Sequence, residues 1–243
     1  MKFERTQVFN FEGALRGMRN PMESHHKSDS YYSNIGDDGS YIIGKEDLGL
    51  GQRLIKGGSE HRKFMRQIII SVDITAPLYW WKEFDTYKVG TTANSTSTMH
   101  KLTNKPITID CFEIDDFYNI EYPISEQRKE LKSNIDEDFV QMCLIPYLEH
   151  LRKTYLKTKD KKYWKELVRW LPESWLQMRT VTMNYENVFN MVNQRKSHKL
   201  NEWSGKDNTN VSNFIAWART LPYAQELIFI DEIKDDTEDS DWA

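Results

Sequence analysis

The stretch from Ile68 to His100 constrains the fold more than any other part of the chain. A β-branched run, Ile68 to Ile74, predicts a strand buried on both faces, and Ala76-Pro77 follows it. Because proline is favoured at the first helical turn, we expect a helix over Leu78 to Lys88, followed by a loop rich in serine and threonine. A strand, a helix and a polar loop in this order commonly direct hydroxyl and backbone N–H groups at a bound anion.

Composition indicates a globular protein with a polar surface. The chain has 243 residues, of which 39% are hydrophobic and 29% are charged, so it can bury a sizeable core. The net charge of −4 gives no general reason to expect nucleic-acid binding, which usually requires a basic excess. We predict one α+β domain over residues 1–230 and an acidic, disordered tail over residues 231–243.

The cysteine content favours a reducing compartment. Cys111 and Cys143 are the two cysteines, and they form no CxxC pair, which argues against a disulfide framework or a zinc site. No apolar run approaches the roughly 20 residues that cross a bilayer. His25-His26 is interpreted as part of a polar loop, so no metal is expected. These features predict a cytoplasmic protein with no membrane partner.

The remaining elements follow from periodicity and from Gly, Pro and Ser positions. Residues 1–45 have little periodicity and are expected to be strand or loop. Ser125 to Arg128 resembles a helix start, and the chain beyond it is expected to be mostly helical. Further elements are predicted as follows: helices over Glu46–Gly57, Phe139–Tyr155, Tyr163–Trp170, Asn187–Gln194 and Val211–Leu227, and a short strand or extended turn over Met178–Met183.

Two blocks of this sequence resemble the flavin-dependent thymidylate synthase family, ThyX. The first is Ala76 to His100, where the family's Arg-His-Arg is replaced by Thr86-Tyr87-Lys88 and its Ser-x-Arg-Tyr by Ser97 to His100. The second is Leu171 to Arg195, which matches the family's Leu-Pro, Thr-x-Asn-x-Arg and later arginine without a gap. Together the blocks cover about a third of the chain.

The resemblance implies an α+β fold with a small mixed or antiparallel sheet and a helical majority. It also implies a homotetramer in which FAD, dUMP and folate meet at subunit interfaces. In the family the flavin passes a hydride and the folate supplies a methylene carbon, a methyltransferase-like step of nucleotide biosynthesis. No protein nucleophile attacks the pyrimidine.

Several residues stand at the positions of the family's substrate groups. Arg195 matches the arginine that holds and polarises the uracil ring, and its guanidinium can donate in a plane to a carbonyl; the alternative is a surface arginine ending a helix. Ser97 matches a phosphate-binding serine, with Ser95 near enough to share the role, although the loop can also be a simple polar turn. Arg169 lies one position beyond the family's phosphate-binding arginine.

At the positions that match the family's flavin-binding residues, this sequence has fewer positive charges than the family. Asn184 matches a flavin-contacting asparagine, Lys88 keeps one cation, and Tyr87 can stack on a ring. Glu186 stands where the family has an arginine, which places a negative charge where a cofactor phosphate would lie. FAD is therefore implied by the resemblance, whereas the lost charges argue against it. Whether folate is involved stays open.

Three hypotheses follow. In the first, the chain is a divergent ThyX-like protein that binds a pyrimidine deoxynucleotide and alkylates it with reduced flavin. In the second, the same fold is a non-catalytic protein that sequesters a nucleotide, with Arg16 and Arg19 clamping a phosphate. In the third, the chain is a structural oligomer without a small ligand.

Overall fold

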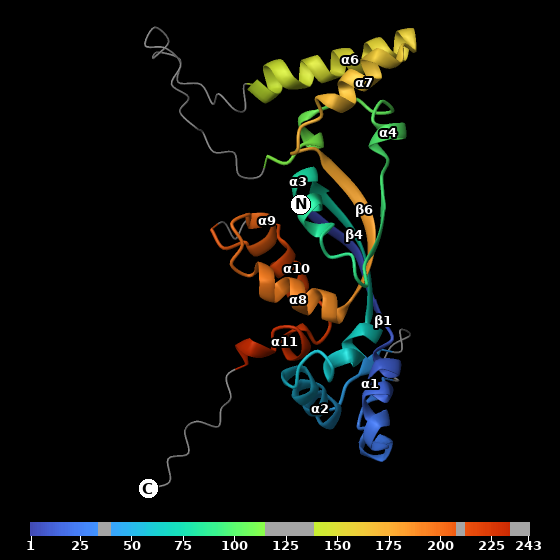
Figure 1. Cartoon of the computed structure of the whole chain (residues 1–243), viewed down its shortest axis with the longest axis vertical. Coiled ribbons are helices and arrows are strands. Elements are labelled where there is room, and N and C mark those ends of the chain that lie inside the picture. The colour runs from blue at the N-terminus through green and yellow to red at the C-terminus, as the bar shows by residue number, and fades with distance from the viewer. Residues whose placement is uncertain (34–39, 115–138, 208–211, 234–243) are drawn as a thin grey trace. The chain divides into compact units, whose positions relative to one another are not determined.

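A computed structural model describes residues 1–33, 40–114, 139–207 and 212–233 (Figure 1). The helix start at Ser125 and residues 234–243 of the acidic tail lie outside these residues. The chain divides into two compact units: unit 1 comprises Met1, Thr75–Thr86 and Asn94–Arg179, and unit 2 comprises Lys2–Ile74, Tyr87–Ala93 and Thr180–Ala243. One domain over residues 1–230 stays a prediction.

A four-stranded sheet has the order β1-β4-β6-β5. Its strands are β1 (Lys2–Phe9), β4 (Ile69–Pro77), β5 (Thr92–Ser95) and β6 (Leu176–Asn184). The backbone bonds from Tyr185 N–H to Ile68 O and from Leu78 N–H to Trp175 O bracket the β4–β6 pair and make it antiparallel. The α+β class with a small antiparallel sheet and a helical majority is therefore confirmed.

Strand β4 matches the predicted β-branched run. Ile70, Val72 and Ile74 are at most 1% exposed and point to one face because side chains alternate along a strand. Ile69 and Ser71 on the other face are partly exposed. The expectation of burial on both faces is therefore met on one face.

Unit 1 is a helical hairpin with short helices beside it. Its elements are α3 (Leu78–Phe84), α4 (Thr98–Lys101), the 3-10 turn Ile109–Cys111, a π-helical turn (Val140–Leu144), α6 (Ile145–Thr158) and α7 (Lys161–Arg169). Leu148 and Leu151 of α6 and Leu167 of α7 pack in one apolar cluster with Leu102, Ile107 and Phe112. The cluster occupies the apolar faces of both long helices.

Unit 2 packs helices around aromatic side chains. Its elements are α1 (Phe11–Arg19), β2 (Tyr31–Tyr32), β3 (Tyr41–Ile42), α2 (Lys45–Lys56), α8 (Tyr185–Arg195), α9 (Asn201–Ser204), α10 (Phe214–Arg219), α11 (Ala224–Leu227), and the 3-10 turns Asn20–Met22, His25–Lys27, Arg62–Gln67 and Ile230–Glu232. Trp203 and Phe214 are fully buried with ring centroids 5.3 Å apart. Phe214 in turn packs against Trp217 of the same helix, also at 5.3 Å.

Three local predictions are wrong. Residues 1–45 contain the eight-residue strand β1 and the nine-residue helix α1. The buried residues of α1 recur at helical spacing: Phe11, Ala14, Leu15 and Met18. Two glycines within the helix lower its helical propensity, so the sequence did not predict it. The helix after Pro77 ends at Phe84. The helix expected over Val211–Leu227 is two helices, α10 and α11, with Pro222 between them, where the missing N–H prevents a continuous helix.

No helix in the described ranges is both long and apolar enough to span a bilayer.

Candidate functional site

Arg195 ends α8 and packs against two aromatic rings of unit 2. Its Nε donates to the Tyr87 hydroxyl at 2.8 Å. Its guanidinium carbon is 5.0 Å from the Trp203 ring centroid and 5.5 Å from that of Tyr87. The Tyr87 hydroxyl donates in turn to Gln194 Oε1 at 2.9 Å. Ring faces attract a cation at these distances, so the half-buried guanidinium is held in a fixed plane.

The loop that carries Tyr87 and Lys88 is tied to the start of α8. Asn184 and Asn187 form a reciprocal cap: Asn184 Oδ1 accepts from the Asn187 N–H at 2.9 Å, and Asn187 Oδ1 accepts from the Asn184 N–H at 3.1 Å. Asn187 Nδ2 also donates to Val89 O at 2.8 Å. Two orphan N–H groups of the helix terminus are thus satisfied, and Asn184 keeps its amide N–H groups for another acceptor.

Gly90 allows this close approach of loop and helix. Its φ is +78°, and a Cβ at this position would lie 2.9 Å from Asn184 Nδ2 and 3.0 Å from Asn187 Oδ1. A side chain would therefore be strained by the backbone conformation and would also collide with the cap. Lys88, two residues earlier, is exposed.

Glu186 does not stand as an isolated negative charge. The residue is 8% exposed, and two arginines of the 3-10 turn before β4 converge on its carboxylate. Arg62 Nε donates to Oε1 at 3.2 Å, and Arg66 donates to both oxygens. The hydrogen bonds that Arg66 donates to Glu186 are the first cause that raises the pKa of Arg66. The three groups together carry a charge of +1, so the repulsion expected for a phosphate at this position is offset.

The two serine positions lie in unit 1: Ser95 ends β5, and Ser97 lies in the short loop before α4. The Ser97 hydroxyl oxygen accepts from the His100 N–H at 3.0 Å and caps the short helix α4. Its own proton stays available for another acceptor, since a hydroxyl both donates and accepts. Thr96 joins this loop to β6: its N–H donates to Met178 O at 2.9 Å, and its carbonyl accepts from Gln177 Nε2 at 2.9 Å. Ser95 is exposed.

Arg169 is the last residue of α7 in unit 1. Its guanidinium forms an ion pair with Glu166, three residues earlier on the same helix. Its side chain is 52% exposed, which makes the pair weak. The arginine can therefore leave Glu166 for another anion at little cost.

The predicted residues thus fall into two groups. Arg195 and Tyr87 are in direct contact, and the cap at Asn184 lies beside the loop that carries Tyr87 and Lys88, all within unit 2. Ser95, Ser97 and Arg169 belong to unit 1. That the two groups act on one ligand stays a prediction.

Sequence reasoning missed three contributors to the unit 2 group. Trp203, fully buried, supplies the second ring against Arg195, and Arg62 and Arg66 neutralise Glu186. The spacing of the two arginines, four residues apart and before a buried strand, was the available signal. Their partner is more than a hundred residues away in the sequence, so the spacing alone could not identify it.

The phosphate clamp proposed for Arg16 and Arg19 is not supported. The side chain of Arg19 is 5% exposed, and its Nε donates to Asp47 at 2.5 Å. Burial favours the protonated form of Asp47, but hydrogen bonds from Ser28, Ser30 and Arg19 outweigh it and lower the pKa. Arg16 pairs with Glu12 at 2.5 Å. The buried Arg19 therefore connects α1 to α2 within unit 2 and is not available to a phosphate.

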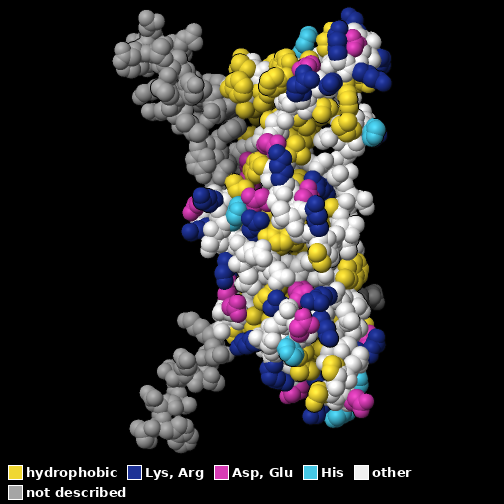
Figure 2. All heavy atoms as spheres, in the orientation of Figure 1, with side chains coloured by type: hydrophobic (Ala, Val, Ile, Leu, Met, Phe, Trp, Pro, Cys, Tyr) yellow, Lys and Arg dark blue, Asp and Glu magenta, His cyan; other side chains and the backbone are white. Residues whose placement is uncertain are grey.

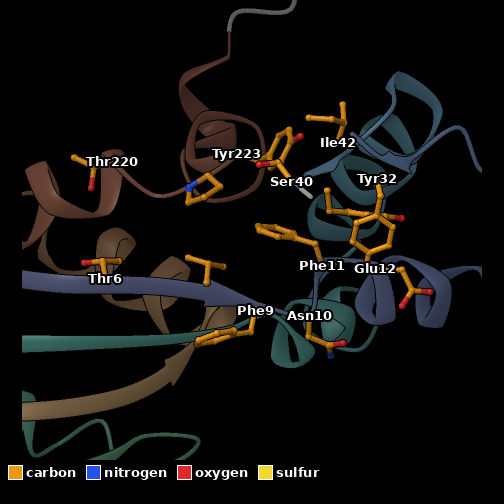
Figure 3. Close-up of a pocket in the computed structure, with 13 residues that line it drawn as sticks. Thr6, Phe9, Asn10, Phe11, Glu12, Tyr32, Ser40, Ile42, Thr220 and Tyr223 are labelled. Carbon is orange, nitrogen blue, oxygen red and sulfur yellow. The ribbon is translucent and has the colours of Figure 1, made fainter. Parts of the chain in front are cut away.

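A second candidate is an open cleft of about 890 Å³ in unit 2 (Figure 3). Phe9, Phe11, Tyr32, Tyr41 and Tyr223 supply aromatic rings to its lining. Of the described residues that line it, Glu12 is the charged one, and none is a lysine or arginine. This lining does not suit a phosphate, so we do not assign the nucleotide to this cleft.

Across the residues for which coordinates are described, no three His, Cys, Asp or Glu side chains gather as metal ligands.

Comparison with known proteins identifies the fold. No family model matches the chain, and no curated protein matches it. Two solved structures of the flavin-dependent thymidylate synthase ThyX from Helicobacter pylori, both with FAD and dUMP, match at 17% identity with TM-scores of 0.59 and 0.58. They cover 96% and 95% of this chain, and 100% and 98% of their own. The chain therefore has a ThyX-like fold.

Proposed function

We propose that this chain binds a pyrimidine deoxynucleotide of the dUMP kind. Arg195 orients and polarises the base, and Ser97, Ser95 and Arg169 hold the phosphate. The observation that carries the proposal is the arginine held against Tyr87 and Trp203 on a fold whose solved neighbours contain dUMP. A guanidinium fixed in one plane is suited to donate to a pyrimidine carbonyl, because little side-chain entropy is lost on binding.

The cofactor side of the proposal rests on Lys88, Asn184 and Tyr87. The amide N–H groups of Asn184 and the exposed ammonium of Lys88 fit the polar atoms of a flavin nucleotide, and the +1 charge around Glu186 fits its diphosphate. A bound reduced flavin would supply the hydride for alkylation of the base. By resemblance the assembly is a homotetramer with ligands at subunit interfaces; whether folate is the carbon donor stays open.

A non-catalytic nucleotide binder is the second candidate. One observation favours it: the groups at the flavin positions are engaged within the protein. The Tyr87 hydroxyl is used by Arg195 and Gln194, and Asn184 Oδ1 caps α8. A protein with this site would hold the nucleotide and not transform it.

Two measurements on the full chain test these candidates. Calorimetric titration with dUMP should give binding that Arg195→Ala weakens at least tenfold, whereas Arg53→Ala, an exposed arginine of α2, should bind as the parent does. Failure of the parent to bind dUMP would refute both candidates. The absorbance spectrum with and without added FAD then separates them: bound flavin and turnover support the enzyme, and dUMP binding without flavin supports the sequestering protein.

A further inference from the structure

The positive charge of the chain is concentrated on one helical hairpin. Between Lys153 and Arg169, seven lysines and arginines stand against two acidic residues, a charge of +5 in a chain whose total is −4. This segment contains the end of α6, the turn after it and all of α7. In Figure 2, dark-blue side chains gather over these helices. The net charge of the whole chain therefore conceals a basic surface, and such asymmetry points to a polyanionic partner.

Four lysines of this surface have no opposite charge of their own. Lys157, Lys159, Lys161 and Lys165 are exposed, and none of them forms an ion pair with any part of the chain that the structure describes. The other cations of the segment are engaged: Lys162 pairs with Asp160 at 3.1 Å and Lys153 with Glu149 at 3.6 Å. Lys157 on α6 and Lys161 and Lys165 on α7 flank one turn, so their charges reinforce each other.

Aromatic side chains alternate with these cations. Trp170 is 56% exposed, and Tyr155, Tyr163 and Trp164 are half-buried. Trp164 is fixed by a hydrogen bond from its Nε1 to Met99 O at 3.3 Å. Cations that track a backbone and rings on which bases stack are the two elements of single-strand recognition.

The hairpin has no continuous exposed apolar face among the described residues. Tyr147 and Leu156 of α6 are exposed, but at nine residues apart they lie on opposite sides of the helix. Leu148, Leu151 and Leu167 are at most 5% exposed within the unit 1 core. A basic helix that lies on a membrane needs such a face for the lipid. The surface therefore fits a nucleic acid better than a bilayer.

We infer that the α6–α7 turn binds the phosphate backbone of single-stranded nucleic acid, without sequence preference. Lys157, Lys159, Lys161 and Lys165 contact phosphates at the turn. Trp170, at the far end of α7, stacks on a base further along the strand. The inference is independent of the proposed nucleotide site.

The test uses the full chain, a fluorescently labelled oligothymidylate and anisotropy as the readout. With four phosphate contacts, affinity should fall about 50-fold between about 50 and 200 mM salt. The variant Lys157→Glu/Lys161→Glu/Lys165→Glu should bind at least tenfold more weakly at low salt, with a salt slope smaller by about 2. The control Lys2→Glu/Lys45→Glu/Lys206→Glu changes the net charge equally at exposed sites of unit 2 and should bind nearly as the parent does.

Three results would overturn the inference. The first is no binding of the parent at low salt, and the second is equal loss in both triple variants. The third is binding to vesicles that contain phosphatidylserine, lost in the first variant, without binding to the oligonucleotide. Circular dichroism of both variants controls for folding; since all six lysines are exposed, unchanged spectra are expected.

Discussion

Replacement of Tyr87 by phenylalanine tests how Arg195 is held. The change removes the hydroxyl that accepts from Arg195 Nε at 2.8 Å and keeps the ring against which the guanidinium packs. A hydrogen bond from a charged donor contributes about 1.5–3 kcal/mol when buried. Because Arg195 is half-buried, we expect about 1 kcal/mol, which weakens dUMP binding about fivefold.

A double-mutant cycle by calorimetry measures this coupling. Four proteins are each titrated with dUMP: the parent, Tyr87→Phe, Arg195→Ala and the double variant. If Tyr87 acts through Arg195, its replacement should cost affinity in the parent and nothing in the Arg195→Ala background. Tyr31→Phe, at an exposed tyrosine of unit 2, is the control.

A merely structural role would have a different signature. In that case Tyr87→Phe would lower the melting temperature and leave the dissociation constant for dUMP unchanged. An affinity loss of the same size in both backgrounds would also refute the reasoning, because it would mean that the hydroxyl contacts the ligand directly.

Three further changes test the packing that supports the site and the two units. Gly90→Ala should lower the free energy of unfolding by about 1–2 kcal/mol, since φ is +78°; equal urea midpoints would contradict this. Glu149→Gln removes a carboxylate whose pKa falls to about 2, first through the hydrogen bonds from Arg152. Because the pKa of Glu149 is lower in the folded state, the carboxylate stabilises the folded state above pH 4.5, and this stabilisation is lost as the pH falls towards 2. The variant should therefore be less stable than the parent by about 2 kcal/mol at neutral pH and about as stable near pH 2. Denaturation at both pH values measures this difference. Asp47→Asn leaves a buried guanidinium without its counter-charge and should cost about 3–5 kcal/mol; an unchanged melting temperature would argue against it.

Elements with one strong local signal were predictable from the sequence. The run Ile68–Ile74 gave strand β4, and the helix over Asn187–Gln194 lies within α8. The prediction for the first 45 residues was wrong because Gly13 and Gly17 lower the helical propensity of α1. Burial of Phe11 and Leu15 in the folded chain stabilises α1, and burial of this kind cannot be predicted from a single sequence.

Contacts between distant positions were not predictable. Periodicity gives a face of a helix, but it does not give the partner of that face. Arg195 was singled out by its place in a matched block, whereas Trp203 reads as one tryptophan among eight. Their contact depends on the turn between α8 and α9, which brings the indole to the guanidinium.

Glu186 shows why a single exchanged charge is a poor guide to a site. Taken alone, a carboxylate in place of an arginine reverses the local field and should repel a phosphate. In the folded chain Arg62 and Arg66 donate to that carboxylate, so the sum of the three groups is positive. The field that a ligand meets is set by all charges within a few ångströms. The charge loss counted along the sequence therefore overstates the loss in space, and a flavin nucleotide stays chemically compatible with this unit.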